Sequence, residues 1–278
     1  MTGTIELTAS GLRLSVGAVS DIGLKRSLNE DSILVLPAVF VVADGMGGYE
    51  SGDQASAAVV AAFRRVARNR ESMTPALVVD ALELADEGVA RVAGRTSRGA
   101  GSTVAGAALV LEPDGPHWLI FNVGDSRVYR HAATALEQIT VDHSLGQELY
   151  RTGRISAQEL AVFKDRNVIT RAIGAADAEA DSWMMPVRVG ERLLLCSDGL
   201  CSEVPDAEML EVLRGDASPD AIARELVERA KSAGGRDNIS VIVVDVLAGG
   251  RALPTEGLVE EAGELVDDST TPIVTVAR

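Results

Sequence analysis

The chain has 278 residues, and its 41 acidic residues outnumber 26 lysines and arginines to give a net charge of −15. No stretch holds a basic run long enough to follow a nucleic-acid backbone, so we exclude a nucleic-acid binder, and the acidic surface disfavours anionic membranes. Apolar residues make up 46% of the chain, which is enough for a sizeable buried core. Only 3% are aromatic, so Val, Leu, Ile and Ala must build that core.

The cysteines, the histidines and the N-terminus exclude several further classes. Cys196 and Cys201 are five residues apart, which fits neither a disulfide framework nor a CxxC pair and predicts two small buried side chains. His117, His131 and His143 are too scattered for a zinc site, so any metal must bind oxygen ligands. The chain lacks a leader pattern and a run of about 18 apolar residues, which predicts a soluble, cytoplasmic protein.

Three short extended segments open the chain before the spacing of the apolar residues changes. They are predicted at residues 14–19, 33–36 and 39–43. From Gly52 the apolar residues recur at helix spacing, and Thr74 followed by Pro75 marks the start of a second helix. These two helices should form a hairpin. Four strands with short connecting turns follow, which requires antiparallel pairing. They are predicted at residues 103–111, 118–123, 127–131 and 136–140.

The second half begins with a segment that interrupts the strand series. Residues 144–167 indicate two short helical turns around Gly153, and we interpret this range as an inserted surface flap. A later helix opens at Ser218 with Pro219 and ends at Gly234. The remaining strands are predicted at residues 169–172, 183–189, 192–197 and 238–247. Strands grouped with strands and helices with helices favour an α+β fold, in which helical layers cover antiparallel sheets.

The composition changes at residue 249. From there to the end, six acidic residues accompany two arginines, and long apolar side chains are few. We therefore predict one domain over residues 1–248 and a loosely ordered acidic tail over residues 249–278.

Aspartates mark the ends of several predicted strands. Two apolar strands end in Asp-Gly, at Asp44 and at Asp198, while Asp125 follows a third strand and Asp237 precedes the last one. Asp-Gly is also common turn chemistry, so any one of these aspartates taken alone is more typical of a turn. If the sheets bring all four to one end, their mutual repulsion requires bound cations. Oxygen-only ligation then selects magnesium or manganese.

A polar cluster near the N-terminus adds a second kind of chemistry. Arg26 precedes Asn29, Glu30 and Asp31 by a few residues. The guanidinium group of arginine offers a planar fork of donors that suits a phosphate. The two acids can form hydrogen bonds to waters bound to a metal. In isolation the cluster could equally be a solvated turn.

Eight segments resemble, in order and spacing, the metal-dependent protein phosphatases, also called the PPM or type 2C Ser/Thr phosphatases. They are Arg26-Ser27-Leu28-Asn29-Glu30-Asp31, Val42-Ala43-Asp44-Gly45-Met46-Gly47-Gly48, Gly101-Ser102-Thr103, Val123-Gly124-Asp125-Ser126-Arg127, Asp142-His143-Ser144, Thr170-Arg171-Ala172-Ile173-Gly174, Ser197-Asp198-Gly199-Leu200 and Asp237-Asn238-Ile239. The resemblance extends over residues 14–247. It implies a four-layer α/β/β/α sandwich of two antiparallel sheets flanked by helix pairs, with residues 144–167 as the flap beside the active site.

The resemblance also implies a role for each predicted site residue. Asp44 would bridge two Mn²⁺ or Mg²⁺ ions, with the carbonyl of Gly45 on one ion and Asp198 and Asp237 on the other. Asp125 together with Asp198 would hold a weaker third ion. The remaining roles fall on the N-terminal cluster: Arg26 would bind the substrate phosphate, while Glu30 and Asp31 would orient metal-bound water. Because two such ions activate water directly, no phospho-enzyme and no cysteine nucleophile is required.

Two departures from the family pattern bear on the reaction. Many members carry a histidine where this chain has Met46, which cannot donate a proton to the leaving oxygen, so a metal-bound water is our candidate general acid. The same Asp-Gly-Met-Gly-Gly pattern points to the bacterial branch. The flap lacks the His-Pro pair that usually precedes its Arg-Asn, here Arg166 and Asn167, which leaves the substrate preference open.

These observations lead to a predicted function and two alternatives. We predict a Ser/Thr phosphatase that acts on phosphorylated proteins in a bacterial cytoplasm, opposite a Ser/Thr protein kinase. A pseudophosphatase that binds phosphoproteins without hydrolysis is the alternative from another class, but its usual mark would be a lost aspartate, and none is lost. A two-metal nuclease is disfavoured by the net charge of −15.

Overall fold

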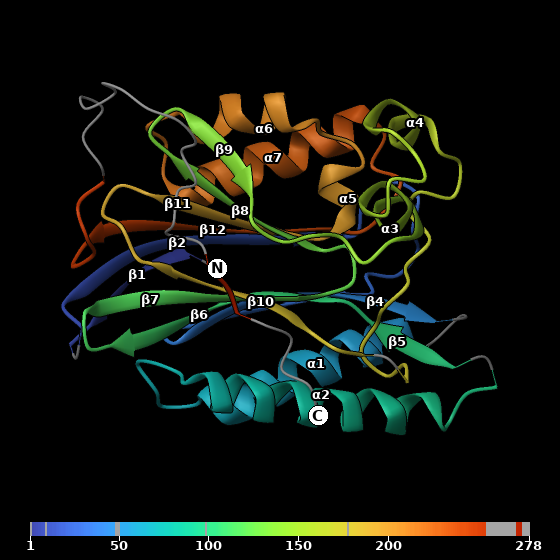
Figure 1. Cartoon of the computed structure of the whole chain (residues 1–278), viewed down its shortest axis with the longest axis horizontal. Helices are drawn as coiled ribbons and strands as arrows, with labels where there is room; N and C mark the ends of the chain where they lie inside the picture. The colour runs from blue at the N-terminus through green and yellow to red at the C-terminus, as the bar shows by residue number, and fades with distance from the viewer. Residues whose placement is uncertain are drawn as a thin grey trace.

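Two antiparallel β-sheets pack face to face, and a pair of helices covers the outer face of each (Figure 1). The structure is a computed structural model that describes residues 2–8, 10–47, 51–97, 99–176, 178–253 and 271–273. This arrangement confirms the predicted α+β class and the four-layer α/β/β/α sandwich. Among the helices of the described residues, none is both long and apolar enough to cross a bilayer.

Sheet A has six strands in the order β1-β2-β12-β11-β8-β9. Their bounds are β1 (Thr2–Leu7), β2 (Leu12–Asp21), β8 (Arg127–Ala132), β9 (Ala135–Gln138), β11 (Arg192–Cys196) and β12 (Ile239–Ala248). Helices α6 (Asp206–Leu213) and α7 (Pro219–Ala233) cover its outer face. Strand β12 lies in the middle of the sheet and is fully apolar over residues 241–244, because neighbours cover both of its faces.

Sheet B has seven strands, six of them in the order β13-β10-β7-β6-β4-β3, with β5 paired to the end of β4. Their bounds are β3 (Asp31–Leu36), β4 (Val39–Gly47), β5 (Ala100–Ser102), β6 (Val104–Glu112), β7 (Gly115–Val123), β10 (Asp181–Pro186) and β13 (Thr271–Ile273). The predicted helical hairpin, α1 (Gly52–Ala67) and α2 (Pro75–Ala93), covers its outer face. The side chain of Thr74 caps α2 by accepting the N–H of Leu77.

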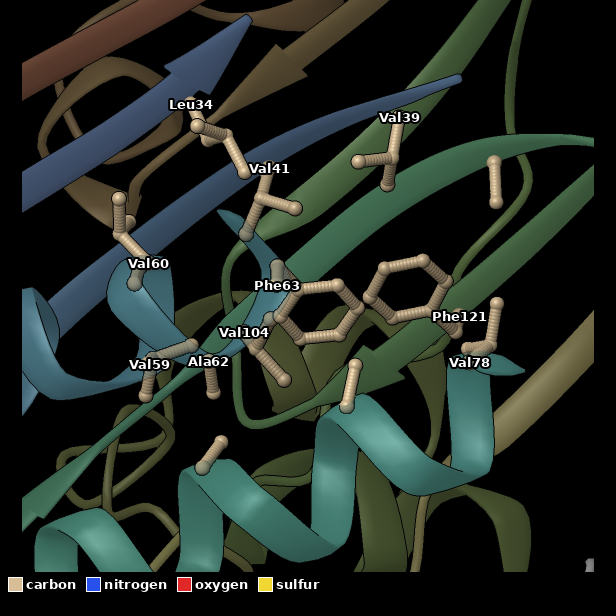
Figure 2. Packing of buried hydrophobic residues seen from close by; sticks show 14 of the residues in the cluster. Leu34, Val39, Val41, Val59, Val60, Ala62, Phe63, Val78, Val104 and Phe121 are labelled. Carbon is tan, nitrogen blue, oxygen red and sulfur yellow. The ribbon is translucent and has the colours of Figure 1, made fainter. Parts of the chain in front are cut away.

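Three apolar layers fill the spaces between the four layers of the sandwich. Strand β4 serves two of them, because successive side chains point to opposite faces: Phe40 faces sheet A, whereas Val41 faces α1 and α2. In the layer under α1 and α2, the rings of Phe63 and Phe121 stack with centroids 5.0 Å apart (Figure 2). Both cysteines are free, with Cys196 fully buried and Cys201 partly buried.

The flap lies between β9 and β10 and contains two short helices, as predicted. These are α3 (Leu145–Arg151) and α4 (Ala157–Val162), and Gly153 adopts a left-handed conformation between them. The predicted strand at residues 169–172 is wrong. That segment forms only isolated bridges, at Ile169 and at Ile173, because it returns along the base of the flap and has no continuous partner strand.

Some elements were absent from the prediction, and the tail is only partly described. The prediction lacked strands β1 and β5 and helices α5 (Asp198–Cys201) and α6; of these, β5 and α5 are only three and four residues long. Residues 254–270 and 274–278 lie outside the described residues, so the tail stays a prediction. Within it, Thr271–Ile273 pairs with β10 at the edge of sheet B, with Thr271 opposite Met184.

Candidate active site

One end of the sandwich gathers the predicted aspartates from both sheets (Figure 1, the end near α3, α4 and α5). They are Asp31 at the start of β3, Asp44 near the end of β4, Asp125 in the turn between β7 and β8, Asp198 at the start of α5 and Asp237 just before β12. We call this group the carboxylate end. The structure therefore brings together carboxylates that are up to 206 positions apart in the sequence.

Direct contacts join the two sheets at this end. Asp31 and Asp44 are cross-strand partners on β3 and β4 of sheet B. The hydroxyl of Ser197, which follows β11 of sheet A, donates a hydrogen bond of 2.7 Å to Oδ2 of Asp31. Ser197 in turn accepts the N–H of Ser240 on β12 at 3.0 Å. These bonds hold the ends of the two sheets in a fixed relation.

The backbone at Asp44 is held by Thr103, which lies between β5 and β6. The N–H of Asp44 donates to Oγ1 of Thr103 at 3.0 Å, and the N–H of Thr103 donates to the carbonyl of Asp44 at 2.8 Å. The hydroxyls of Thr103 and Ser126 are 2.7 Å apart, which links this position to the turn that carries Asp125. Thr103 and Ser126 thus connect the backbone at Asp44 to the turn that carries Asp125. Both residues belong to the sequence motifs, but the motifs alone do not indicate this role.

The glycines after Asp44 and Asp198 serve close packing and not turns. Gly45 lies within β4 and Gly199 within α5, and neither has a positive φ. A Cβ on Gly45 would lie 1.9 Å from the carbonyl oxygen of Gly52, and one on Gly199 would lie 1.9 Å from that of Asn238. The turn interpretation of Asp-Gly is therefore wrong at both positions.

Gly199→Ala is expected to destabilise the fold by about 3 kcal/mol or more, because the Asn238 carbonyl is backbone and cannot move aside without shifting β12. The free energy of unfolding in urea measures this. Gly3→Ala is the matched control, since a Cβ on Gly3 meets nothing within 4 Å, and it should change stability by less than about 0.5 kcal/mol. A Gly199→Ala protein as stable as the control would contradict the packing argument.

The N-terminal cluster is fastened to the carboxylate end by Asn238. Its side-chain amide donates to the carbonyls of Ile22 and Leu28, both at 3.0 Å, and its Oδ1 accepts the N–H of Glu30 at 2.8 Å. Arg26 donates from Nη2 to Oδ2 of Asp237 at 2.7 Å, and its Nη1 lies 3.9 Å from Oε2 of Glu30. The Arg26 side chain remains 47% exposed, so part of the guanidinium faces solvent.

Burial and mutual repulsion raise the pKa values of the carboxylates. Burial, followed by the charges of Asp31, Asp198, Asp125 and Asp237, raises the pKa of Asp44 well above its usual range. Burial is also the largest cause for Asp31, whose pKa rises to about 7, and for Asp125, whose pKa rises to about 8. The pKa of Asp198 is raised by burial and by the charge of Asp237. Such a cluster is unfavourable at neutral pH unless positive charge enters it.

The oxygens at this end fit a hard divalent cation. Within the described residues, Oδ1 of Asp31, Asp125 and Asp198 is buried and has no hydrogen-bond partner. A bound Mg²⁺ or Mn²⁺ would satisfy such oxygens and reverse the repulsion. Across the described part of the chain, no three or more Asp, Glu, His or Cys side chains already form a complete ligand set. The Arg26 bond to Asp237 engages a carboxylate that the predicted second ion would need.

The metal-free protein is expected to lose stability as the pH rises. The folded-state pKa values of Asp31 and Asp125 lie above their usual value of 3.8, so the folded state binds more protons than the unfolded state. Their contribution to the free energy of unfolding is fully present below about pH 4 and is lost as the pH rises towards 8. A pKa difference of one between the folded and unfolded states corresponds to roughly 1.4 kcal/mol, so the loss reaches several kcal/mol before screening and relaxation.

Melting temperatures in a chelator between pH 5 and pH 8.5 measure this effect. Asp125→Asn removes one titrating group, so its melting temperature should depend less steeply on pH. Added Mn²⁺ should stabilise the wild type more at pH 8.5 than at pH 5, because the ion needs ionised ligands. A wild-type slope no steeper than that of Asp125→Asn would contradict the raised pKa of Asp125.

The turn that carries Asp125 rests on residues whose roles the sequence did not reveal. The N–H of Gly124 donates to Nδ1 of His143 at 3.1 Å, so the ring proton is on Nε2, which lies 3.2 Å from Oδ2 of Asp181. His143 is 4% exposed. Arg127 forms a bidentate pair with Asp142, with Nη2 2.6 Å from Oδ2. His143 and Asp142 stand in one of the eight motifs, which is the only signal that could have found them.

A cavity of about 200 Å³ separates the carboxylate end from the flap. Asp125 and Asp198 line one side, and Arg127 lies beside them. The flap contributes its own side chains to the other side, among them Gln147, Leu160, Arg166 and Asn167. A group entering this cavity would therefore contact both the flap and two of the predicted metal ligands.

Comparison with known proteins decides the family. A family model described as Protein phosphatase 2C matches residues 26–239, a range that begins at Arg26 and ends two residues after Asp237. This chain belongs to the protein phosphatase 2C family. It is 34% identical over 239 residues to the "Serine/threonine phosphatase stp" of Listeria innocua, covering 81% of this chain and 93% of the relative. It is also 34% identical over 250 residues to the "Serine/threonine protein phosphatase PstP" of Mycobacterium tuberculosis, covering 85% of this chain and 46% of that longer protein.

Solved structures of related phosphatases agree. The crystal structure of the Mycobacterium tuberculosis serine/threonine phosphatase PstP/Ppp matches with a TM-score of 0.78 at 32% identity, covering 84% of this chain and 99% of that one. A structure of the catalytic domain of PstP in complex with two manganese ions matches with a TM-score of 0.77 at 32% identity, over 85% of this chain and 100% of that one. The protein phosphatase 2C chain described here is thus a bacterial-type, metal-dependent phosphoprotein phosphatase, and its substrates are phosphoproteins.

Proposed function

We propose that the carboxylate end is the active site of this phosphatase and that it binds two Mn²⁺ or Mg²⁺ ions. The observation that carries this proposal is the set of buried aspartates with raised pKa values and unpartnered oxygens. Asp44 and the carbonyl of Gly45 would hold one ion, and Asp44 would share the other with Asp198 and Asp237. Oxygen ligands of this kind suit Mg²⁺ and Mn²⁺ and suit softer metals less.

We infer that phosphoserine and phosphothreonine are hydrolysed by direct attack of a water that bridges the two ions, since such ions lower the pKa of water and neutralise phosphoryl oxygens. Glu30 and Asp31 would orient that water. Asp31 is suited to this because Ser197 occupies only one of its oxygens and leaves Oδ1 without a partner among the described residues. Cys196 is fully buried against α7 and is not placed to act as a nucleophile.

Arg26 would bind the substrate phosphate. Its bond to Asp237 places the guanidinium at the mouth of the carboxylate end, and its 47% exposure leaves donors free to reach a ligand from solvent. The hydrogen bond to Asp237 and the charges of Asp237 and Glu30 raise the pKa of Arg26, so the group is charged at neutral pH. A planar, permanently charged fork of this kind suits bidentate contact with a phosphoryl group.

Asp125 would act in protonation of the leaving group. Met46 stands where many family members carry a histidine and offers no proton. Asp125 with Asp198 would hold a third, weaker ion beside the cavity under the flap, and a water on that ion would protonate the leaving oxygen. No predicted ligand position has lost its carboxylate, so no observation favours a pseudophosphatase.

We further propose that the enzyme acts in the bacterial cytoplasm on proteins phosphorylated by a Ser/Thr kinase. Support comes from the relatives, which are named as bacterial serine/threonine phosphatases.

Release of phosphate from a phosphothreonine peptide tests the proposed site. Activity should require added Mn²⁺ or Mg²⁺, vanish in excess chelator, return when Mn²⁺ is restored, and not be supported by Zn²⁺. Hydrolysis that survives exhaustive removal of metal would overturn the two-ion proposal. Circular dichroism of the metal-free protein is the control that separates loss of the metal from loss of the fold.

A further inference from the structure

Large exposed apolar side chains are concentrated beside the carboxylate end. The described residues include eight of them. Three of the eight lie within seven positions, at Ile22, Leu24 and Leu28, in the segment that joins β2 to β3. We call residues 22–28 the 22–28 loop. Single exposed apolar residues are normal on a protein surface, but a concentration of them next to a functional site indicates contact with another molecule.

The backbone of the 22–28 loop is held in place by the segment that leads into β12. The carbonyls of Ile22 and Leu28 both accept hydrogen bonds of 3.0 Å from Nδ2 of Asn238, so the two ends of the loop meet at one nitrogen atom. The N–H of Leu24 donates to the carbonyl of Gly235 at 2.7 Å. A Cβ on Gly235 would lie 2.9 Å from Cγ of Leu24, so the base of this side chain also packs on that segment. Contact with so fixed a surface requires little ordering of the loop.

The fold does not require apolar side chains in this loop. The hydrogen bonds that hold it use backbone atoms of Ile22, Leu24 and Leu28, which polar residues would supply equally well. Leu24 is nevertheless 58% exposed and Leu28 43% exposed. Covering apolar surface that lies in water lowers the free energy. The two leucines thus offer apolar surface to another molecule.

The same loop carries the residue proposed to bind the substrate phosphate. Arg26 stands two positions after Leu24 and two before Leu28, so its Cα lies within about 7 Å of the Cα atoms of both. The substrates of this family are phosphoproteins, so the chain on either side of the phosphorylated residue lies against the surface around Arg26. Residues within a few positions of the phosphorylated one therefore come within reach of the two leucines.

We propose that the 22–28 loop is a substrate-docking surface that favours phosphoproteins with a large apolar residue close to the phosphorylated residue. The inference rests on the proposed role of Arg26. Leu24 and Leu28 would cover the apolar side chain of the substrate while Arg26 holds its phosphate. No residue of the 22–28 loop lines the cavity under the flap, so this contact is separate from any contact with the flap. A polar residue at the same substrate position would leave the leucines in water.

Binding of non-hydrolysable phosphonate peptides in saturating Mn²⁺ tests the docking apart from catalysis. Each peptide carries one leucine, at a position from four before to four after the phosphothreonine mimic, and an all-serine peptide is the reference. Fluorescence anisotropy should show that the best leucine peptide binds the wild type about tenfold more tightly than the reference, as burial of a leucine allows. In Leu24→Ser/Leu28→Ser that preference should fall below threefold.

Leu111→Ser/Leu247→Ser is the matched control. Leu111 is 40% and Leu247 42% exposed, and they lie at the ends of β6 and β12 that point away from the carboxylate end. This variant should keep the wild-type preference for the leucine peptide. Substitution of exposed side chains should leave the fold of both variants intact, and circular dichroism checks this.

Hydrolysis of the matching phosphothreonine peptides separates the docking from the proposed function. The wild-type preference for the best leucine peptide should appear in KM and not in kcat. Absence of metal-dependent hydrolysis of every peptide would overturn the proposed function, while the anisotropy would still decide the docking. Equal binding of the leucine and serine peptides by the wild type, or a preference that survives in Leu24→Ser/Leu28→Ser, would overturn the docking. Self-association of the wild type that this variant loses would assign the loop to a second copy and would also overturn it.

Discussion

Asp44→Asn is expected to lower kcat at least a thousandfold, because an amide cannot bridge two cations as the proposed site requires. Such a loss corresponds to a barrier increase of about 4 kcal/mol. The substitution keeps the size of the side chain and the backbone bonds of Asp44 to Thr103, so the local structure should persist. Steady-state hydrolysis of a phosphothreonine peptide at saturating Mn²⁺ measures the loss.

A second readout separates this explanation from damage to the fold. Asp44 is surrounded by like charges that raise its pKa, so removing its charge should make the metal-free protein more stable than the wild type at pH 8. Asp114→Asn, at the other end of the sandwich, is the control and should leave kcat unchanged. Two tight Mn²⁺ sites found by calorimetry in Asp44→Asn would contradict the assignment of Asp44 as the shared ligand.

Much of the fold could be predicted because short sequence patterns, such as helix caps, mark where the main helices begin. Helix α2 begins at Pro75 after the capping Thr74, and α7 begins at Pro219 after the capping Ser218, as the sequence indicates. The error at residues 169–172 has a different origin. Ile169 and Thr170 are β-branched and resemble the start of a strand in the sequence, but only a partner strand makes such a segment one, and this stretch instead closes the base of the flap.

The predicted site residues lie together, but the groups that support them could not be predicted from spacing. Ser197 reaches Asp31 across 166 positions, and Asn238 reaches the carbonyl of Leu28 across 210. Both hydrogen bonds depend on how the two sheets are positioned relative to each other, and no local sequence pattern encodes that position. The role of Gly45 could not be predicted for a similar reason. A glycine is needed there because the backbone of Gly52, at the start of α1, packs against it, and this contact exists only in the folded structure.

Asp125→Asn is expected to lower turnover on a phosphopeptide by about a hundredfold or more, with little change in KM. The proposed role of Asp125 lies in protonation of the leaving alkoxide, a step for which acid catalysis typically contributes 10²–10⁴-fold. An aryl phosphate has a good leaving group and needs less protonation, so its hydrolysis should fall much less. Removing the charge also relieves repulsion of Asp198, so the fold should not suffer.

Arg26→Ala supplies the matched contrast. Loss of a charge-assisted phosphate contact removes roughly 1.5–3 kcal/mol of binding that is present in the ground state and the transition state alike. KM should therefore rise at least as much as kcat falls, and the peptide and the aryl phosphate should be affected to a similar degree. If Asp125→Asn damaged both substrates equally, or if calorimetry showed that it had lost two tight Mn²⁺ ions, Asp125 would belong to the pair of ions that activates water and not to the step that releases the alcohol.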